Sequence, residues 1–256
     1  MREEKYSEAI DHFNQAYSFY SSQGIQRSIG YNMLSRADAL WRMGRYDDAK
    51  PLLDQASAIA DKPGGELKQL SLAIKLNASE MVLSQELFAD AKSRAQVVIE
   101  QSGTEFSNAA LGAKIVVAGA ESYSGGAAAA KRTATDVLEM ARKLNDPSQL
   151  ANAELTLAEA MLLANDAGSA GMYAEHAAAV FGQLNQTASQ WRALLVVAAI
   201  KQKTGDKTAA REYSVRAKES LSKLEQRWGG DNYQNYLRRP DVRRFVNQLD
   251  QLTSAE

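Results

Sequence analysis

Small apolar residues recur along the chain at helical spacing, in a pattern that repeats about every 40 positions. The segment containing Tyr6 and Ala9 is matched by one containing Tyr46 and Ala49, at an offset of 40 residues. From Ala9 the series continues at spacings of 40, 42, 39, 40 and 40 residues, as Ala9, Ala49, Ala91, Ala130, Ala170 and Ala210. Self-similarity at one period predicts a stack of similar supersecondary units.

Two further series of small residues stand at fixed offsets from the first. Seven positions after each alanine lie Ala16, Ala56, Val98, Val137, Ala177 and Ala217, and twelve positions before it lie Ala37, Ser79, Ala118, Ala158 and Ala198. Positions four and seven residues apart share one face of a helix. Because small residues on such faces let two helices approach closely, each unit is predicted to be an antiparallel helix hairpin.

The register predicts an all-α protein in which one lone second helix precedes five complete hairpins. The expected limits are 3–20 for the lone helix and 24–61, 65–102, 105–144, 148–184 and 187–226 for the hairpins. Turn residues fall between the two helices of four hairpins, at Gly44, Gly125, Gly168 and Gly205. Pro51 falls close to the start of its helix, where a missing amide proton is tolerated.

The last 30 residues depart from the period. Gly229 and Gly230 end the last long helix, and Pro240 can begin a final short one. Arginines and aromatic residues alternate here, at Arg227, Trp228, Tyr233, Tyr236, Arg238, Arg239, Arg243, Arg244 and Phe245. We interpret the segment as a cap whose aromatic residues cover the last hairpin, with a nucleic-acid site as the alternative. The predicted domains are a repeat array over 1–226 and a capping segment over 227–256.

Composition and charge narrow the functional classes. Thirty basic and 31 acidic residues give a net charge of −1, so no global field attracts nucleic acid or an anionic membrane. The chain has no cysteine, no apolar stretch near the ~20 residues of a membrane span and no signal-peptide core, so a cytoplasmic location is expected. His12 and His176 lie in different units without metal-ligand spacing. We therefore expect no enzyme activity and no catalytic, cofactor or metal site.

The segment from Ala39 to Ala56 resembles the tetratricopeptide repeat (TPR) family. The family's order of glycine, aromatic, alanine and large apolar residue is met by Gly44, Tyr46, Ala49, Leu53 and Ala56, and in part by Tyr6, Ala9, Phe13 and Ala16. The period near 40 exceeds the ~34 residues usual for the family. The resemblance implies a right-handed superhelical solenoid of TPR-like antiparallel helix hairpins with a short C-terminal helical cap.

The resemblance also implies a concave groove, lined by the first helix of each hairpin, that binds peptides or partner domains. Carried onto this sequence, the candidate groove residues are Tyr31, Asp38, Trp41, Glu80, Asn152, Glu159 and Arg192. Family members that hold a C-terminal carboxylate use lysines where this chain has leucine and isoleucine, so a carboxylate clamp is not expected. The acidic residues Asp38, Glu80 and Glu159 suggest a basic or polar ligand, or are simply solvated helix faces.

We therefore predict a non-catalytic scaffold or docking module for a protein or peptide partner, within a larger multidomain bacterial signalling protein. The alternative is a regulatory sensor that binds a ligand or peptide and controls an attached enzyme domain such as a kinase. The helix at 3–20 carries an apolar stripe that includes Tyr6, Phe13 and Tyr17 and has only one expected neighbour in the chain. Either self-association through this stripe or fraying of this helix is expected, as for a fragment that lacks its preceding helix.

Overall fold

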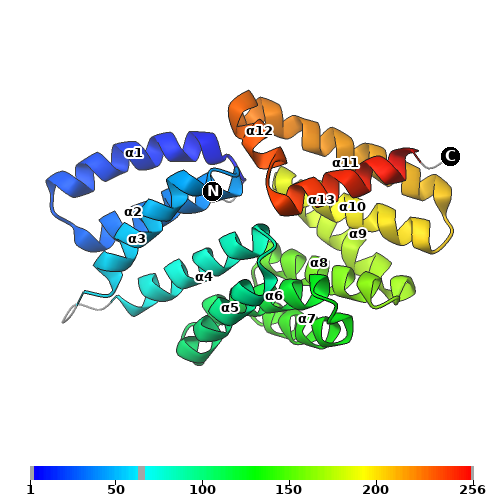
Figure 1. The fold of residues 1–256 in the computed structure, drawn as a ribbon, viewed down its shortest axis with the longest axis horizontal. Helices are drawn as coiled ribbons and strands as arrows, with labels where there is room; N and C mark the ends of the chain where they lie inside the picture. Colours follow the sequence, from blue (N-terminus) through cyan, green and yellow to red (C-terminus); the bar gives the residue numbers. More distant parts are fainter. Residues whose placement is uncertain (1–2, 63–66, 255–256) are drawn as a thin grey trace.

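The computed structural model of the protein describes residues 3–62 and 67–254. Thirteen α-helices and no strand occupy this part of the chain (Figure 1). In chain order they are α1 (Tyr6–Ser22), α2 (Gln26–Arg42), α3 (Tyr46–Ala60), α4 (Lys68–Ser84), α5 (Phe88–Ser102), α6 (Ser107–Tyr123), α7 (Ala127–Arg142), α8 (Pro147–Leu163), α9 (Ala167–Gln183), α10 (Thr187–Lys203), α11 (Lys207–Trp228), α12 (Gly230–Leu237) and α13 (Pro240–Ser254). The predicted all-α solenoid is confirmed, and the predicted limits of the lone helix and the five hairpins agree with it to within three residues.

Each helix packs on the next one in the chain, so that α2–α3, α4–α5, α6–α7, α8–α9 and α10–α11 form five hairpins. The first helices of successive hairpins also contact each other. They form one continuous wall, which we call the inner row: α2, α4, α6, α8 and α10. A repeat that packs only on its neighbours in this way is typical of a solenoid.

The three series of small residues lie where helices approach each other. The members on α2 to α10 are all fully buried, as at Ala49, Ala118 and Ala158, each with 0% of its surface exposed. Only on α1 are the equivalent residues, Ala9 and Ala16, half-buried. The buried small residues lie on both helices of each hairpin. A larger side chain at any of these positions would push the two helices apart.

The turns inside the hairpins use residues with a left-handed backbone. Gly44, Gly125 and Gly205 have φ values of 84°, 89° and 89°, which a residue without a Cβ adopts readily. In the α8–α9 turn this residue is Asn165, with φ 63°, whereas the predicted turn residue Gly168 lies inside α9. Asparagine is the residue that most often replaces glycine in this conformation.

The C-terminal segment continues the solenoid. The helix expected from Pro240 is α13, which at 15 residues is not short. It packs on α11 and α10, just as α4 packs on α3 and α2. Consequently α13 takes the place of the first helix of a sixth hairpin, and Val242, Phe245 and Leu249 are buried there.

The two ends of the solenoid meet. Tyr6 is buried, and its ring centroid lies 5.3 Å from that of Trp228. Asn232 Nδ2 donates to the hydroxyl of Ser7 at 3.2 Å, and α13 contacts α4. Figure 1 shows the start of α1 beside α12, which closes the superhelix into a ring.

Ring closure corrects the prediction for the apolar stripe of α1. The expectation that this stripe has only one neighbour in the chain is wrong at its first turn, where Trp228 covers Tyr6. Further along, Phe13 and Tyr17 are half-buried beside α2, and the guanidinium of Arg36 lies 5.4 Å from the ring of Tyr17. The structure therefore gives no support to self-association through this stripe.

Candidate functional site

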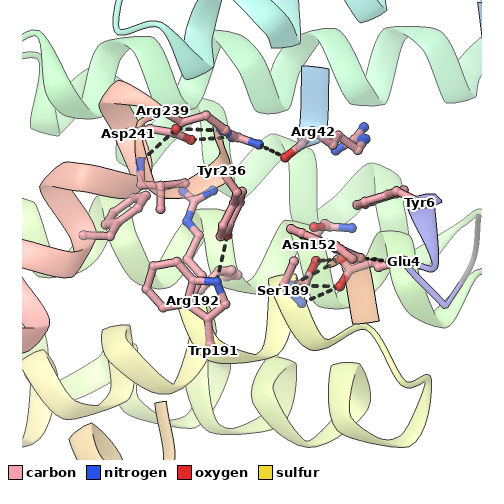
Figure 2. A pocket seen from close by; sticks show the side chains of 15 residues that line it. Glu4, Tyr6, Arg42, Asn152, Ser189, Trp191, Arg192, Tyr236, Arg239 and Asp241 are labelled. Atoms are coloured by element: carbon pink, nitrogen blue, oxygen red, sulfur yellow. Dashed lines mark hydrogen bonds and ion pairs between the residues drawn. The ribbon is translucent and has the colours of Figure 1, made fainter. Parts of the chain in front are cut away.

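The inner row and α13 enclose two adjoining cavities at the centre of the ring. The larger measures about 190 Å³ and the smaller about 110 Å³. The two cavities have six lining residues in common, which are Arg42, Asn152, Arg192, Arg239, Asp241 and Phe245. We call the two together the central cavity; Figure 2 shows the side chains around the smaller part.

Six of the seven predicted groove residues gather at this place. Trp41, Glu80, Asn152 and Arg192 line the central cavity, while Asp38 and Glu159 bind arginines that line it. Tyr31 lies in another part of the chain, packed in the core formed by α2, α3 and α4, with the guanidinium of Arg27 5.9 Å from its ring. The spacing of the repeats thus brought together residues from four helices of the inner row.

Arg42 joins the first two hairpins through two carboxylates. Its Nε donates to Asp38 Oδ1 at 2.8 Å, and its Nη2 donates to Glu80 Oε2 at 2.9 Å. The guanidinium also lies 4.6 Å from the ring of Trp41, which is 3% exposed. Burial raises the pKa of Glu80, and the positive charge of Arg42 opposes that rise.

Asn77 extends this network into the core. The indole Nε1 of Trp41 donates to Asn77 Oδ1 at 3.0 Å, and Asn77 Nδ2 donates to Asp38 Oδ1 at 2.7 Å. Each side chain of this network therefore has a hydrogen-bond partner within it; in order, they are Trp41, Asn77, Asp38, Arg42 and Glu80. A network satisfied in this way holds its side chains in one arrangement.

Arg192 forms the equivalent pair between α8 and α10. Its Nε and Nη2 donate to the two carboxylate oxygens of Glu159 at 2.8 and 2.6 Å. The guanidinium lies 4.8 Å from the ring of Phe245, so α13 covers the pair. The acidic residues of the predicted groove are thus neutralised by arginines rather than left free for a basic ligand.

The C-terminal arginines add groups to the central cavity that were not among the predicted groove residues. Arg239 binds Asp241 through Nη2 at 2.7 Å and donates from Nη1 to the carbonyl of Arg42 at 2.7 Å. Arg244 donates to Glu86 at 2.5 Å, and its guanidinium lies 3.8 Å from the ring of Tyr123. These two arginines face the inner row, while Arg238 and Arg243 are exposed. The only sequence signal for them was the alternation of arginines and aromatic residues after position 226.

The N-terminal residues form one wall of the smaller part of the cavity. The carboxylate of Glu4 accepts hydrogen bonds from the amide of Ala188 at 2.5 Å and from the hydroxyl of Ser189 at 2.6 Å. The indole of Trp228 donates to the carbonyl of Glu4 at 2.8 Å. Figure 2 shows Glu4, Ser189 and Asn152 close together, with Arg239 and Asp241 toward the other end. Nothing in the repeat pattern had indicated a role for Glu4.

Most charged side chains around the central cavity are paired. The arginine head groups around the cavity each bind a carboxylate, so the lining offers hydrogen bonds and little free charge. In the part of the chain that the structure describes, no group of three or more histidine, aspartate or glutamate side chains could hold a metal ion. His176, one of two histidines, instead contacts Glu154 at 2.5 Å on a separate face.

Comparison with known proteins identifies the fold. No family model and no curated protein sequence matches the chain. Among solved structures it is similar to BtubC from P. vanneervenii, with a TM-score of 0.61 and 16% identity over 88% of this chain and 92% of that one. It is also similar to a Rap protein in complex with Competence and Sporulation Factor, with a TM-score of 0.67 and 16% identity over 96% of this chain and 74% of that one. The chain therefore has a TPR-like helical repeat fold.

The length and hydropathy of the helices bear on the expectation that no segment of the chain spans a membrane. Across 3–62 and 67–254, none of the helices combines the length and the hydropathy that crossing a bilayer requires.

Proposed function

We propose that the protein is a non-catalytic docking module that holds an extended segment of a protein partner in the central cavity, around Asn152. The observation that carries the proposal is the position of Asn152 on α8, whose exposed side chain lines both parts of the cavity. Its neighbours there, Arg42 and Arg192, are held in place by ion pairs. A site preorganised in this way binds without the cost of ordering its own side chains.

The chemistry of the lining matches a peptide backbone. Asn152 Nδ2 donates to the carbonyl of Ser148 at 3.0 Å, which leaves its Oδ1 and its second N–H for a ligand. A guanidinium has five N–H donors, and Arg192 uses two of them on Glu159. Phe245 and Leu155 add apolar surface. A carbonyl-rich segment satisfies these groups, because Asn152 and Arg192 offer N–H donors to its carbonyl oxygens.

The similarity to the Rap protein supports this proposal at the level of the fold. That structure contains Competence and Sporulation Factor, so a superhelix of this architecture can hold a partner. At 16% identity the similarity says nothing about which partner this chain binds. The partner class proposed here rests on the side chains of the central cavity.

The proposal can be tested with peptides selected from a random displayed library on the purified chain. The best synthetic peptide is then titrated by calorimetry against the natural chain and against Asn152→Ala. We expect Asn152→Ala to weaken binding at least ~10-fold, because it removes the donor and acceptor at the centre of the site.

Asn14→Ala is the matched control, since Asn14 is an exposed asparagine on the outside of α1. It should leave the affinity unchanged. Equal affinities of all three chains for every selected peptide would place binding outside the central cavity and would reject the proposal.

A regulatory sensor is the second candidate, and the closure of the ring favours it. A segment bound in the smaller part of the cavity touches both the N-terminal residue Glu4 and the C-terminal residue Arg239. Occupancy can therefore be communicated to whatever is attached to either end. In this version the chain would control an enzyme domain such as a kinase, and the added prediction is a ligand-dependent change in the distance between α1 and α11.

A further inference from the structure

Residues 3–7, which we call the N-terminal strap, are the part of the ring that joins its two ends most directly. Glu4 and Tyr6 line the smaller part of the central cavity, opposite Arg192 and Asn152. The strap therefore forms a wall of the cavity and not only the beginning of α1. Moving it away would open the cavity without moving any helix of the inner row.

The strap is held by hydrogen bonds at Glu4 and Ser7 and by the buried ring of Tyr6. Glu4 binds the start of α10 through Ala188 and Ser189, and Trp228 donates to the carbonyl of Glu4. Ser7 donates to the carbonyl of Trp228 at 2.9 Å. The ring contact of Tyr6 with Trp228 is the main apolar one. By contrast, the hairpins are held to each other by the buried small-residue faces along whole helices.

Glu4 is held in an unfavourable state by these contacts. Its φ of 55° lies in the left-handed region, which is unfavourable for a residue with a Cβ. The other non-glycine residues with positive φ are Glu86, Asn145, Asn165 and Asn185, which follow helix ends where this conformation is common. Glu4 precedes a helix instead. Its carboxylate is also buried, which raises its pKa although Ser189 and Ala188 donate hydrogen bonds to it.

We propose that the N-terminal strap is a gate that detaches from Ser189 and Trp228 while all the hairpins stay folded, and so opens the smaller part of the central cavity. Release relieves the backbone of Glu4 and returns its carboxylate to water, whereas each hairpin keeps its neighbours. The gate depends on the proposed function only for the identity of the segment that it admits to the cavity. Its opening can be measured with no ligand present.

The absence of cysteine in the chain allows a direct measurement of opening. Lys5→Cys in the strap and Lys223→Cys on α11 introduce two exposed attachment points for spin labels. Pulsed electron paramagnetic resonance then gives the distance distribution between the labels. We expect one main distance for the attached strap and a minor longer one for the detached strap, and Glu4→Ala should increase the longer population at least ~3-fold.

Glu139→Ala is the matched control, because Glu139 is an exposed glutamate on α7, away from the strap. It should leave the distance distribution unchanged. The helix content of Glu4→Ala, measured by circular dichroism, should equal that of the natural chain. A distance distribution unaltered by Glu4→Ala, or a longer distance that appears only with loss of helix content, would overturn the gate.

Hydrogen exchange measured by nuclear magnetic resonance supplies a second readout at the contact itself. The amides of Ala188 and Ser189 face the carboxylate of Glu4, so Glu4→Ala should accelerate their exchange at least ~10-fold. The amides of Ser148 and Gln149 bind Asp146 at the start of α8 and should not change. Equal exchange at both helix starts would contradict the gate. Opening of the strap without any peptide binding would reject the proposed function alone, and peptide binding to a chain whose strap never detaches would reject the gate alone.

Discussion

The backbone of Gly44 in the α2–α3 turn lies directly against the carbonyl of Asn235 in α12, so closely that a Cβ at Gly44 would overlap it. This contact joins the first complete hairpin to the C-terminal segment, across the closed ring. Gly44 is therefore needed for two reasons, its left-handed φ of 84° and its approach to α12. The repeat pattern had indicated only the first.

Gly44→Ala should reduce the free energy of unfolding by about 1–2 kcal/mol through backbone strain, and further through the overlap with Asn235. Gly205→Ala is the control for strain alone, because Gly205 has φ 89° and nothing within 4 Å of its missing Cβ. Chemical denaturation followed by circular dichroism compares the two. Equal losses of unfolding free energy in Gly44→Ala and Gly205→Ala would mean that α12 moves away from the new Cβ at no energetic cost.

Replacing the buried small residues with leucine should separate the packed helices. Ala118→Leu and Ala158→Leu are each expected to cost roughly 1–3 kcal/mol, since both alanines are completely buried. Ala179→Leu, at an exposed position in the middle of α9, should change stability by less than about 0.5 kcal/mol. Coincident melting curves for the buried and exposed variants would show that the small residues do not set the packing.

Replacing one member of the Arg192–Glu159 pair should destabilise the fold more than replacing both members. Arg192→Gln leaves the carboxylate of Glu159 buried at 5% exposure without its counter-charge, at a cost of about 2–3 kcal/mol. Adding Glu159→Gln should recover at least half of that loss, and denaturation of the two variants measures it. Arg94→Gln, which breaks an exposed pair with Asp90, should cost less than about 1 kcal/mol.

Alkaline pH should destabilise the protein through its buried tyrosines. Burial, together with the negative charge of Glu159, raises the pKa of Tyr123 to about 12, although Arg192 and Arg244 oppose the rise. Because the folded state keeps the phenol neutral while the unfolded state ionises near pH 10, stability is full below that value and falls as pH rises toward 12. Unfolding measured between pH 9 and pH 11.5 should show this slope.

Tyr123→Phe should reduce the slope, because the variant has one fewer group to ionise. Burial raises the pKa of Tyr6 and Tyr236 as well, so part of the slope should remain. Absorbance at 295 nm should show a tyrosine that titrates only as the protein unfolds and is missing in the variant. An unchanged slope would mean that the ring of Tyr123 reaches water in the folded state.

The sequence by itself determined the repeat and its register. Helix periodicity and the need for small residues where two helices touch are local constraints, so Ala118 and Ala158 could be assigned to buried interfaces without coordinates. The same register assembled Trp41, Glu80, Asn152 and Arg192 on one wall, because successive hairpins stack in order. Left-handed turn residues could be recognised where glycine occupied them, and were missed at Asn165.

Only the tertiary structure decided where that wall meets the ends of the chain. Each hairpin adds a small rotation to the superhelix, and no local pattern specifies the sum of those rotations over five hairpins. That sum places Glu4 against Ser189 and Gly44 against Asn235, and it brings Arg239 beside Arg42. These contacts join residues about 185 to 200 positions apart, so they follow from the geometry of the whole ring and could not be read from any one repeat.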